Sequence, residues 1–220
     1  EETIRKAQRT FSTILQLMDL YPDFKFLQSS AQIYKDIKEN NIFLFQKIKE
    51  KVMKEQWIVE GGMWVECDSQ LPSGEALVRQ FLYAQKFFEK EFQKTCKIAW
   101  LPDTFGFNPN LPQILKKSDI EYFVTTKLSW NETNLFPYDL FLWKGIDGTR
   151  IIAHIYARYG GYNGSTEIKE IIENYRNYQQ RNLSERMIYT FGYGDGGGGP
   201  TYEMIERLNI MKDLPFIPDI

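Results

Sequence analysis

Two aspartates in the sequence follow segments predicted as strands, and their surroundings are unusual. Asp103 comes directly after the apolar run 97–101 and precedes aromatic residues and a glycine. Asp195 lies in a loop, residues 191–200, that holds six glycines. A carboxylate at a strand end can act as nucleophile, general base or metal ligand. The alternatives are a turn or helix-capping role for Asp103 and a flexible linker for the glycine-rich loop.

Aromatic residues lie close to further polar side chains in segments that are also expected near strand ends. Trp64 stands beside Glu66 and Asp68, and Trp130 follows Lys127. Aromatic faces stack on the apolar faces of sugars while carboxylates bind hydroxyls, so this pattern suits a sugar site. The alternative is a solvated loop with one anchoring tryptophan. Two carboxylates at different strand ends, in an aromatic cleft, are typical of glycoside hydrolysis.

The overall composition restricts the classes of partner. Lys and Arg total 27 against 29 Asp and Glu, a net charge of −2, so clustered positive charge for nucleic acid is not expected. No apolar run approaches the ~20 residues that span a bilayer, so no membrane partner is expected. The cysteines, Cys67 and Cys96, are too few for a disulfide scaffold and predict reduced thiols in a cytoplasmic protein. The single histidine, His154, cannot build a multi-histidine metal site by itself.

Hydrophobic periodicity predicts helices that alternate with short apolar strands. Segment 73–92 is the clearest helix, with Ser73 as its N-cap. Segments 141–143 and 151–155 are expected to pair as a hairpin across the turn signal Asp147-Gly148. The alternation favours a parallel α/β sheet or a (β/α) barrel, whose active sites lie at the carboxyl ends of the strands. Further helices are expected near 1–20, 33–53 with a hinge at 40–41, 109–117, 168–178 and 204–211, and further strands at 24–27, 57–59, 97–101, 122–126 and 187–193.

Seven short motifs give the sequence a resemblance to a known family. They are Gly61-Gly-Met-Trp-Val-Glu66, Leu71-Pro-Ser-Gly-Glu75, Val78-Arg-Gln-Phe-Leu82, Pro102-Asp-Thr-Phe-Gly106, Leu111-Pro-Gln-Ile-Leu115, Lys127-Leu-Ser-Trp-Asn131 and Gly194-Asp-Gly-Gly-Gly-Gly-Pro-Thr201. In this order, and without large gaps, they resemble the α-mannosidases of glycoside hydrolase family 38. The fourth motif and the glycine-run motif are specific when they occur together.

The resemblance implies a fold and a mechanism. It implies a single catalytic α/β domain over residues 1–220, a parallel-stranded (β/α) barrel of the family 38 α-mannosidase type that is incomplete in this chain. It further implies a retaining enzyme that hydrolyses terminal α-linked mannose and binds one zinc ion. Asp103 matches the catalytic nucleophile, which is also a zinc ligand in the family, and Asp195 is the candidate acid/base. We assign substrate binding to Trp64, Glu66, Asp68, Phe105, Lys127 and Trp130.

Further zinc ligands of the family have no counterpart in this chain. The resemblance places a His-x-Asp motif before Glu1 and another histidine beyond Ile220, so we expect truncation at both ends and a fragment that is inactive by itself. His154 matches neither position, which favours a structural role. The expected partner is an α-mannoside oligosaccharide, and self-association into a homo-oligomer is left open. The alternatives are a non-catalytic carbohydrate-binding fragment and a metal-dependent carbohydrate deacetylase on a similar barrel.

Overall fold

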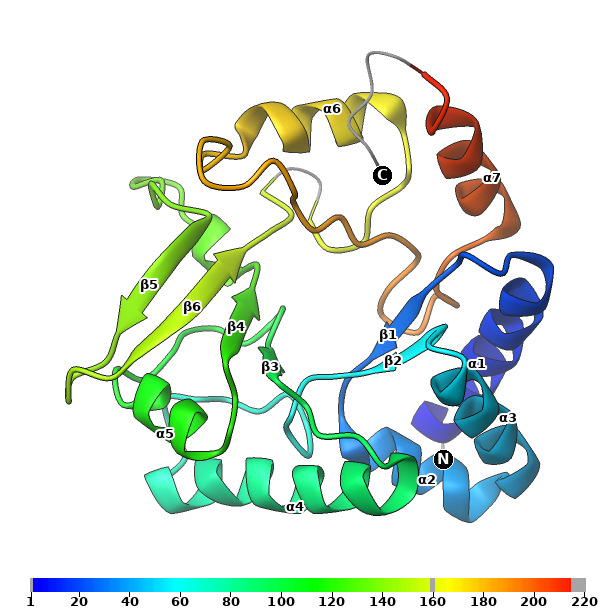
Figure 1. Ribbon diagram of the computed structural model, residues 1–220, viewed down its shortest axis with the longest axis horizontal. Helices are drawn as coiled ribbons and strands as arrows, with labels where there is room; N and C mark the ends of the chain where they lie inside the picture. The colour runs from blue at the N-terminus through cyan, green and yellow to red at the C-terminus, as the bar shows by residue number, and fades with distance from the viewer. Residues whose placement is uncertain (1, 159–160, 215–220) are drawn as a thin grey trace.

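The strands β1 to β4 lie toward the inside of the molecule with helices around them, while the β5–β6 hairpin forms one outer edge (Figure 1). The structure, a computed structural model, describes residues 2–158 and 161–214. β1 (Phe26–Gln28) and β2 (Trp57–Val59) form a parallel pair. β3 (Ile98–Trp100), β4 (Tyr122–Thr125) and β6 (Arg150–Ile155) form a parallel sheet, and β5 (Leu140–Lys144) extends it as an antiparallel edge strand. A parallel bridge between Gly61 and Ala99 joins the pair to the sheet.

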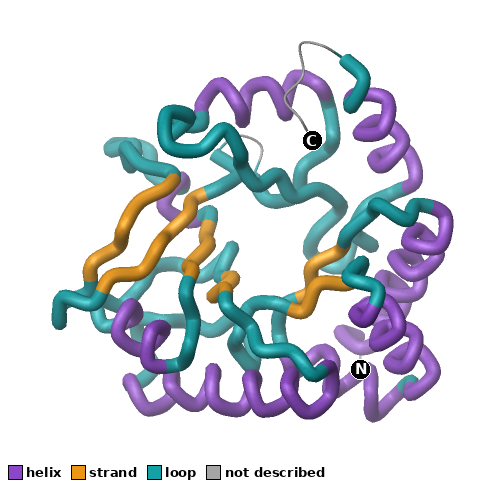
Figure 2. Tube along the Cα trace, viewed as in Figure 1, coloured by secondary structure: helices purple, strands orange, loops and turns teal. Residues whose placement is uncertain are grey.

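The helices form where the periodicity predicts them, on the outside of the strands (Figure 2). α4 (Gly74–Phe92) begins after Ser73, whose Oγ accepts a hydrogen bond from Ala76 N at 3.2 Å. α2 (Ala31–Asn40) and α3 (Ile42–Met53) meet at Asn41, whose side chain caps α3 by accepting from Leu44 N at 3.0 Å. The remaining elements are α1 (Glu2–Leu20), α5 (Leu111–Lys117), the 3₁₀ helix η1 (Lys127–Ser129), α6 (Ile168–Asn177) and α7 (Tyr202–Met211). Over the described ranges, none of these helices combines the length and apolar character needed to cross a bilayer.

Aromatic side chains fill the contact between the β1–β2 pair and the helices. The ring of Trp57 meets Phe11 of α1 edge-on with 5.0 Å between centroids, and it meets Phe26 of β1 at 4.8 Å. Its Nε1 donates to Tyr34 Oη at 2.8 Å, and that hydroxyl donates to Gln28 O at 3.0 Å. Trp57 and Tyr34 are both fully buried, so the polar atoms of both rings need these partners. This packing holds α1 and α2 against β1 and β2.

The sheet differs in two ways from the expected parallel barrel. β5 runs antiparallel to β6, because the Asp147-Gly148 turn closes the predicted hairpin, so the sheet is mixed. The strand expected at 187–193 is wrong: among the described residues this segment makes isolated bridges, at Phe191 and Tyr193, and no ladder. A strand needs a neighbouring strand to pair with. Here a groove of about 270 Å³ separates residues 189–191 from residues 24–27 at β1, so the two segments do not pair. The described residues therefore form an arc of parallel strands rather than a complete barrel.

Candidate active site

The carboxyl ends of three neighbouring parallel strands carry the polar side chains of the candidate site. Asp103 follows β3, Lys127 follows β4, and Tyr162 lies in the segment after β6. Because parallel neighbours end at the same edge of a sheet, these segments lie together. Lys127 Nζ forms an ion pair with Asp103 Oδ1. The structure thus brings together two of the residues predicted from the sequence.

The ammonium group of Lys127 is enclosed by aromatic rings. Its Nζ lies 4.5 Å from the ring centroid of Phe105 and 3.9 Å from that of Trp130, within the range of cation–π attraction. The Lys127 side chain is 7% exposed, whereas that of its partner Asp103 is 46% exposed. Phe105 and Trp130 are 81% and 72% exposed, respectively. The cation is therefore shielded, while the carboxylate and much of each ring are free to meet a ligand.

Glu66 contacts the backbone that carries Asp103. Its Oε1 accepts hydrogen bonds from Asp103 N at 2.5 Å, Thr104 N at 2.9 Å and Thr104 Oγ1 at 3.2 Å. Burial raises the pKa of Glu66 above its ordinary value, and these hydrogen bonds, which favour the charged form, oppose that rise. The sequence predicts Glu66 as a substrate-binding residue. In the structure, its Oε1 contacts the backbone of the loop that follows β3.

Tyr162 contacts Asp103 and lies within the electrostatic influence of Asp195. Its pKa is raised to about 12, first by burial, then by the charge of Asp103 and a hydrogen bond with that carboxylate, and further by the charge of Asp195. The Tyr162 hydroxyl is therefore hydrogen bonded with Asp103, while Asp195 affects it only through its charge. Sequence reasoning missed Tyr162, although the glycines flanking it at 161 and 164, just beyond the apolar run of β6, gave a signal of the same kind as the loop of Asp195.

The loop of Asp195 packs closely against the segment of Tyr162. A side chain at Gly194 would place its Cβ 2.3 Å from Asn163 Oδ1, which is closer than atoms can approach. Asp195 itself has a left-handed backbone conformation, φ 51°, and its side chain is exposed. On its other side the loop meets α1, where Arg9 donates a hydrogen bond to Gly196 O. The glycines thus allow close contact with neighbouring segments, which favours an ordered loop over a flexible linker.

Trp64 and Asp68 are engaged by their own surroundings. Trp64 Nε1 donates to Gln32 Oε1 of α2 at 2.7 Å, and its ring meets Phe87 of α4 edge-on at 5.9 Å. Asp68 Oδ1 accepts from the backbone N of residues 70 and 71 at 2.7 and 2.8 Å, and these bonds lower the pKa of this exposed carboxyl. The contacts match the solvated loop with one anchoring tryptophan that the sequence left as the alternative, and substrate binding by these two side chains stays a prediction.

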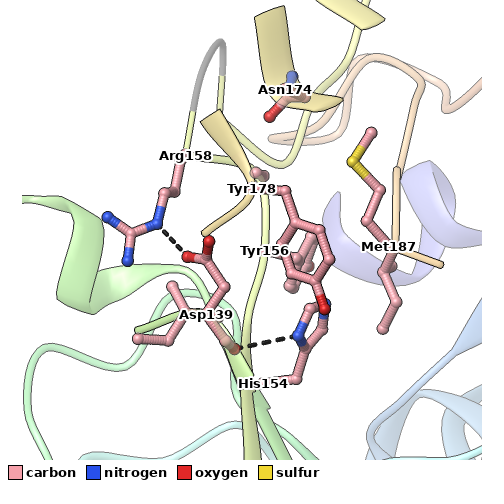
Figure 3. Close-up of a pocket in the computed structure, with 10 residues that line it drawn as sticks. Asp139, His154, Tyr156, Arg158, Asn174, Tyr178 and Met187 are labelled. Atoms are coloured by element: carbon pink, nitrogen blue, oxygen red, sulfur yellow. Dashed lines mark hydrogen bonds and ion pairs between the residues drawn. The ribbon is translucent and has the colours of Figure 1, made fainter. Parts of the chain in front are cut away.

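His154 of β6 lies in a small polar cavity of about 20 Å³ (Figure 3). Its Nδ1 is 3.1 Å from Asp139 O, and its ring meets Tyr178 edge-on at 6.1 Å. Its buried Nε2 has no hydrogen-bond partner among the described residues. Burial lowers the pKa of His154, with the backbone contact to Asp139 opposing that shift. These contacts fit the structural role that the sequence predicts for this histidine.

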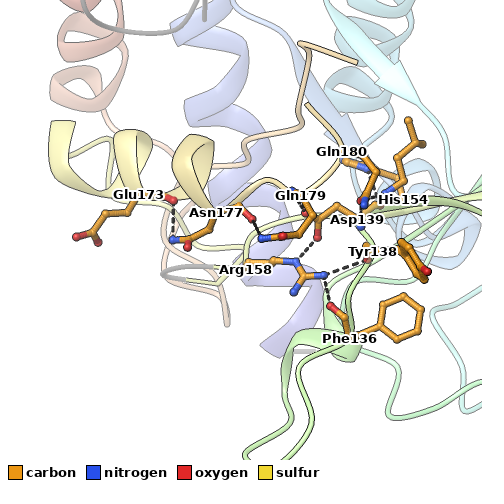
Figure 4. A network of polar contacts seen from close by, with 10 residues as sticks. Phe136, Tyr138, Asp139, His154, Arg158, Glu173, Asn177, Gln179 and Gln180 are labelled. Atoms are coloured by element: carbon orange, nitrogen blue, oxygen red, sulfur yellow. Dashed lines mark hydrogen bonds and ion pairs between the residues drawn. The ribbon is translucent and has the colours of Figure 1, made fainter. Parts of the chain in front are cut away.

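A buried ion pair beside this cavity joins three segments of the chain (Figure 4). Arg158 Nε pairs with Asp139 Oδ1, and Arg158 Nη2 donates to Phe136 O at 2.6 Å and Tyr138 O at 3.0 Å. Asp139 Oδ2 accepts from Gln179 N at 2.6 Å. Asp139 is 1% exposed, so its charge requires these partners. The network holds the end of β6, the segment before β5 and the segment after α6 together.

The described residues do not complete the zinc site that the resemblance implies. Within ranges 2–158 and 161–214, no group of three or more His, Cys, Asp and Glu side chains is placed to hold a metal ion. Asp103 offers one carboxylate, and the ammonium of Lys127 pairs with its Oδ1. Protein zinc sites take at least three protein ligands. These residues therefore do not fit a zinc ion by themselves.

The candidate site thus combines a carboxylate, an enclosed cation and exposed aromatic rings at the ends of parallel strands. The chain belongs to the glycosyl hydrolases family 38, since the model of that family's N-terminal domain matches residues 1–220. This match confirms the resemblance that the sequence motifs indicate. The mixed sheet of this chain is therefore part of the N-terminal domain of that family.

Proteins of similar sequence match this chain over its whole length. The chain is 50% identical over 220 residues to alpha-mannosidase G of Dictyostelium discoideum and 41% identical over 220 residues to human alpha-mannosidase 2C1. Both matches cover 100% of this chain but 20% and 21% of those proteins, so the chain spans about a fifth of their length. The crystal structure of an alpha-mannosidase from Enterococcus faecalis V583 has a TM-score of 0.78 at 17% identity, covering 97% of this chain and 25% of that one.

Proposed function

We propose that the protein containing this chain is a retaining α-mannosidase that removes terminal α-linked mannose from oligosaccharides. The observation that carries the proposal is the identity of 50% and 41%, over all 220 residues, to proteins named alpha-mannosidase. The site geometry supports it, because Asp103 is partly exposed beside aromatic rings that can stack on a sugar.

In the first step of the proposed reaction, Asp103 is the nucleophile. One of its carboxylate oxygens attacks the anomeric carbon, the bond from that carbon to the leaving oxygen breaks, and Asp195 gives its proton to the leaving oxygen. The product of this step is a mannosyl ester of Asp103. The ion pair with Lys127 holds the Asp103 carboxylate in place before the attack.

In the second step, Asp195 acts as the base. It takes a proton from water while the water oxygen bonds to the anomeric carbon and the ester bond to Asp103 breaks. Two inversions retain the α configuration. Tyr162 forms a hydrogen bond with Asp103 and can help to position that carboxylate.

Zinc dependence is a separate proposal. We propose that Asp103 supplies one ligand of a zinc ion and that the other protein ligands come from outside the described residues. The ion would act as a Lewis acid on sugar oxygens. A cytoplasmic location also stays a prediction, which the two free cysteines favour.

Hydrolysis of an aryl α-mannoside by the full-length protein tests the proposed function. We expect Asp103→Asn to lower kcat by roughly a thousandfold or more, because an amide cannot form the covalent intermediate. Asp23→Asn, at an exposed turn after α1, is the matched control and should retain activity. The first product detected by NMR should be the α anomer. An inactive wild type, an active Asp103→Asn, or a β product would each contradict the proposal.

A further inference from the structure

Two glutamates hold the two ends of β3. At the start of the strand, Glu60 Oε2 accepts hydrogen bonds from Lys97 N at 3.0 Å and Ile98 N at 3.1 Å. At its end, Glu66 Oε1 accepts from the backbone N of residues 103 and 104 at 2.5 and 2.9 Å. Each carboxylate thus accepts bonds from a pair of consecutive backbone amides.

The course of the backbone explains why carboxylates are needed there. Gly61 and Gly62 have φ of 122° and 68°, which turns the chain away from β3 directly after β2. The pairing between this segment and β3 is reduced to the bridge from Gly61 to Ala99. Backbone amides without a ladder partner need another acceptor, and a carboxylate gives a stronger hydrogen bond than a neutral oxygen. Glu60 and Glu66 supply acceptors for these amides on either side of β3.

The two glutamates differ in what they hold. Glu66 fixes the amide of Asp103 itself and both donors of Thr104, whose Oγ1 also donates to Cys67 O at 3.2 Å. Thr104 is 6% exposed, so the backbone after Asp103 is anchored in the protein. Lys127 holds the carboxylate end of the same side chain. Asp103 is therefore fixed at its backbone by Glu66 and at its oxygen by Lys127.

We propose that Glu66 is a positioning residue that sets the Asp103 carboxylate for attack, a role that rests on the proposed function. Glu66 acts through the backbone amides of residues 103 and 104 and does not need to contact the sugar. This differs from the substrate-binding role expected from its place beside Trp64 and Asp68. Glu60 makes the same type of contact at the opposite end of β3, so it is a natural control.

Four variants of the full-length protein test the proposal: Glu66→Ala, Glu66→Gln, Glu60→Ala and Glu60→Gln. A displacement of the reacting group by about 1 Å can cost about 100-fold, so we expect Glu66→Ala to lower kcat by about that factor with KM changed less than about threefold. Glu66→Gln keeps an acceptor oxygen and should stay within about tenfold of wild type. Both Glu60 variants should stay within about threefold in kcat. Hydrogen exchange at the amides of Asp103 and Thr104 should accelerate in Glu66→Ala and not in Glu60→Ala.

The outcomes separate a positioning role for Glu66 from a purely structural role and from a substrate-binding role. Equal losses of kcat in Glu66→Ala and Glu60→Ala would show a general loss of structure and overturn the proposal. A higher KM with unchanged kcat in Glu66→Ala would instead make Glu66 a substrate-binding residue. No rescue by Glu66→Gln would also contradict the positioning role, because its acceptor oxygen remains. An inactive wild type would refute the proposed function, whereas an active wild type with unaltered Glu66→Ala would refute the positioning role alone.

Discussion

At the scale of single residues, the unequal exposure of Lys127 and Asp103 sets the character of the site. Burying an ammonium group costs several kcal/mol unless it is paired. The ion pair with the Asp103 carboxylate and the contacts with the rings of Phe105 and Trp130 offset this cost. Each ring contact contributes about 0.5–2 kcal/mol. The position of the cation thus depends on the carboxylate, which itself remains open to solvent. The motifs predict all four residues as site residues, but the spacing alone does not predict that one cation joins them.

His154 should make the protein less stable as the pH falls. Its pKa is lowered by burial from the ordinary value of 6.5, so the folded state resists protonation while the unfolded state takes up a proton. Stability from the neutral ring is therefore complete above about pH 6.5 and is lost as the pH falls from there toward the folded pKa. Around the ring, Asp139 and Arg158 form an ion pair, and burial raises the pKa of the Tyr156 and Tyr178 hydroxyls above its ordinary value.

Comparison with His154→Gln in the full-length protein measures this loss of stability at low pH, because glutamine carries no charge at pH 7.5 or at pH 5.0. The melting temperature of the wild type should fall more than that of the variant between pH 7.5 and pH 5.0. The difference between the two proteins cancels the contribution of the other titrating groups. A difference that stays constant between the two pH values would show that His154 is protonated equally in the folded and unfolded states.

At the scale of elements, local sequence signals predict the boundaries well. The N-cap at Ser73, the hinge at Asn41 and the hairpin turn at Asp147-Gly148 all form as the sequence indicates. Each depends on neighbours within a few residues, such as the bonds from Thr149 N and Oγ1 to Asp147 at 3.0 and 2.6 Å. Segment 187–193 fails as a strand because a strand requires a distant partner edge, which its own residues do not encode.

Two glycine-to-alanine substitutions should change stability in opposite directions. Gly148, in the hairpin turn, has φ 88°, and a Cβ there would meet only Lys144 Cε at 3.8 Å, so the cost of Gly148→Ala is backbone strain of about 1–2 kcal/mol. Gly74 opens α4 with nothing within 4 Å of a Cβ, so Gly74→Ala should stabilise by about 0.4–1 kcal/mol. Thermal unfolding of both variants checks the signs. Changes of the same sign would contradict the assigned backbone conformations.

At the scale of the whole molecule, the site is assembled from segments far apart in the chain. Asp103, Lys127, Tyr162 and Asp195 come from four separate segments, and only the sheet brings the first three to one edge. Sequence motifs predicted three of the four because the motifs occur together and in order along the chain. Tyr162 was missed because its importance depends on its neighbours in space, Asp103 and Asp195, and not on its neighbours in sequence.

The contact between the Asp195 loop and the Tyr162 segment should control activity. A Cβ at Gly194 would lie 2.3 Å from Asn163 Oδ1, so Gly194→Ala requires either the Asn163 side chain to move or the two segments to separate, and we expect the segments to separate. A shift of about 1 Å in the position of Asp195 should lower kcat about 100-fold. Asn163→Ala removes the clashing oxygen and, because Asn163 is exposed, should by itself leave kcat within about threefold of wild type.

The double variant Gly194→Ala/Asn163→Ala decides whether this clash is the cause. If the side chain of Asn163 is what Gly194→Ala collides with, the double variant should recover most of the lost kcat, giving a coupling of about 1–3 kcal/mol between the two positions. Steady-state kinetics of the full-length protein and its three variants provide the cycle. Additive losses would mean that Gly194→Ala acts through the backbone of its own loop. The close packing of the two loops would then not determine the position of Asp195.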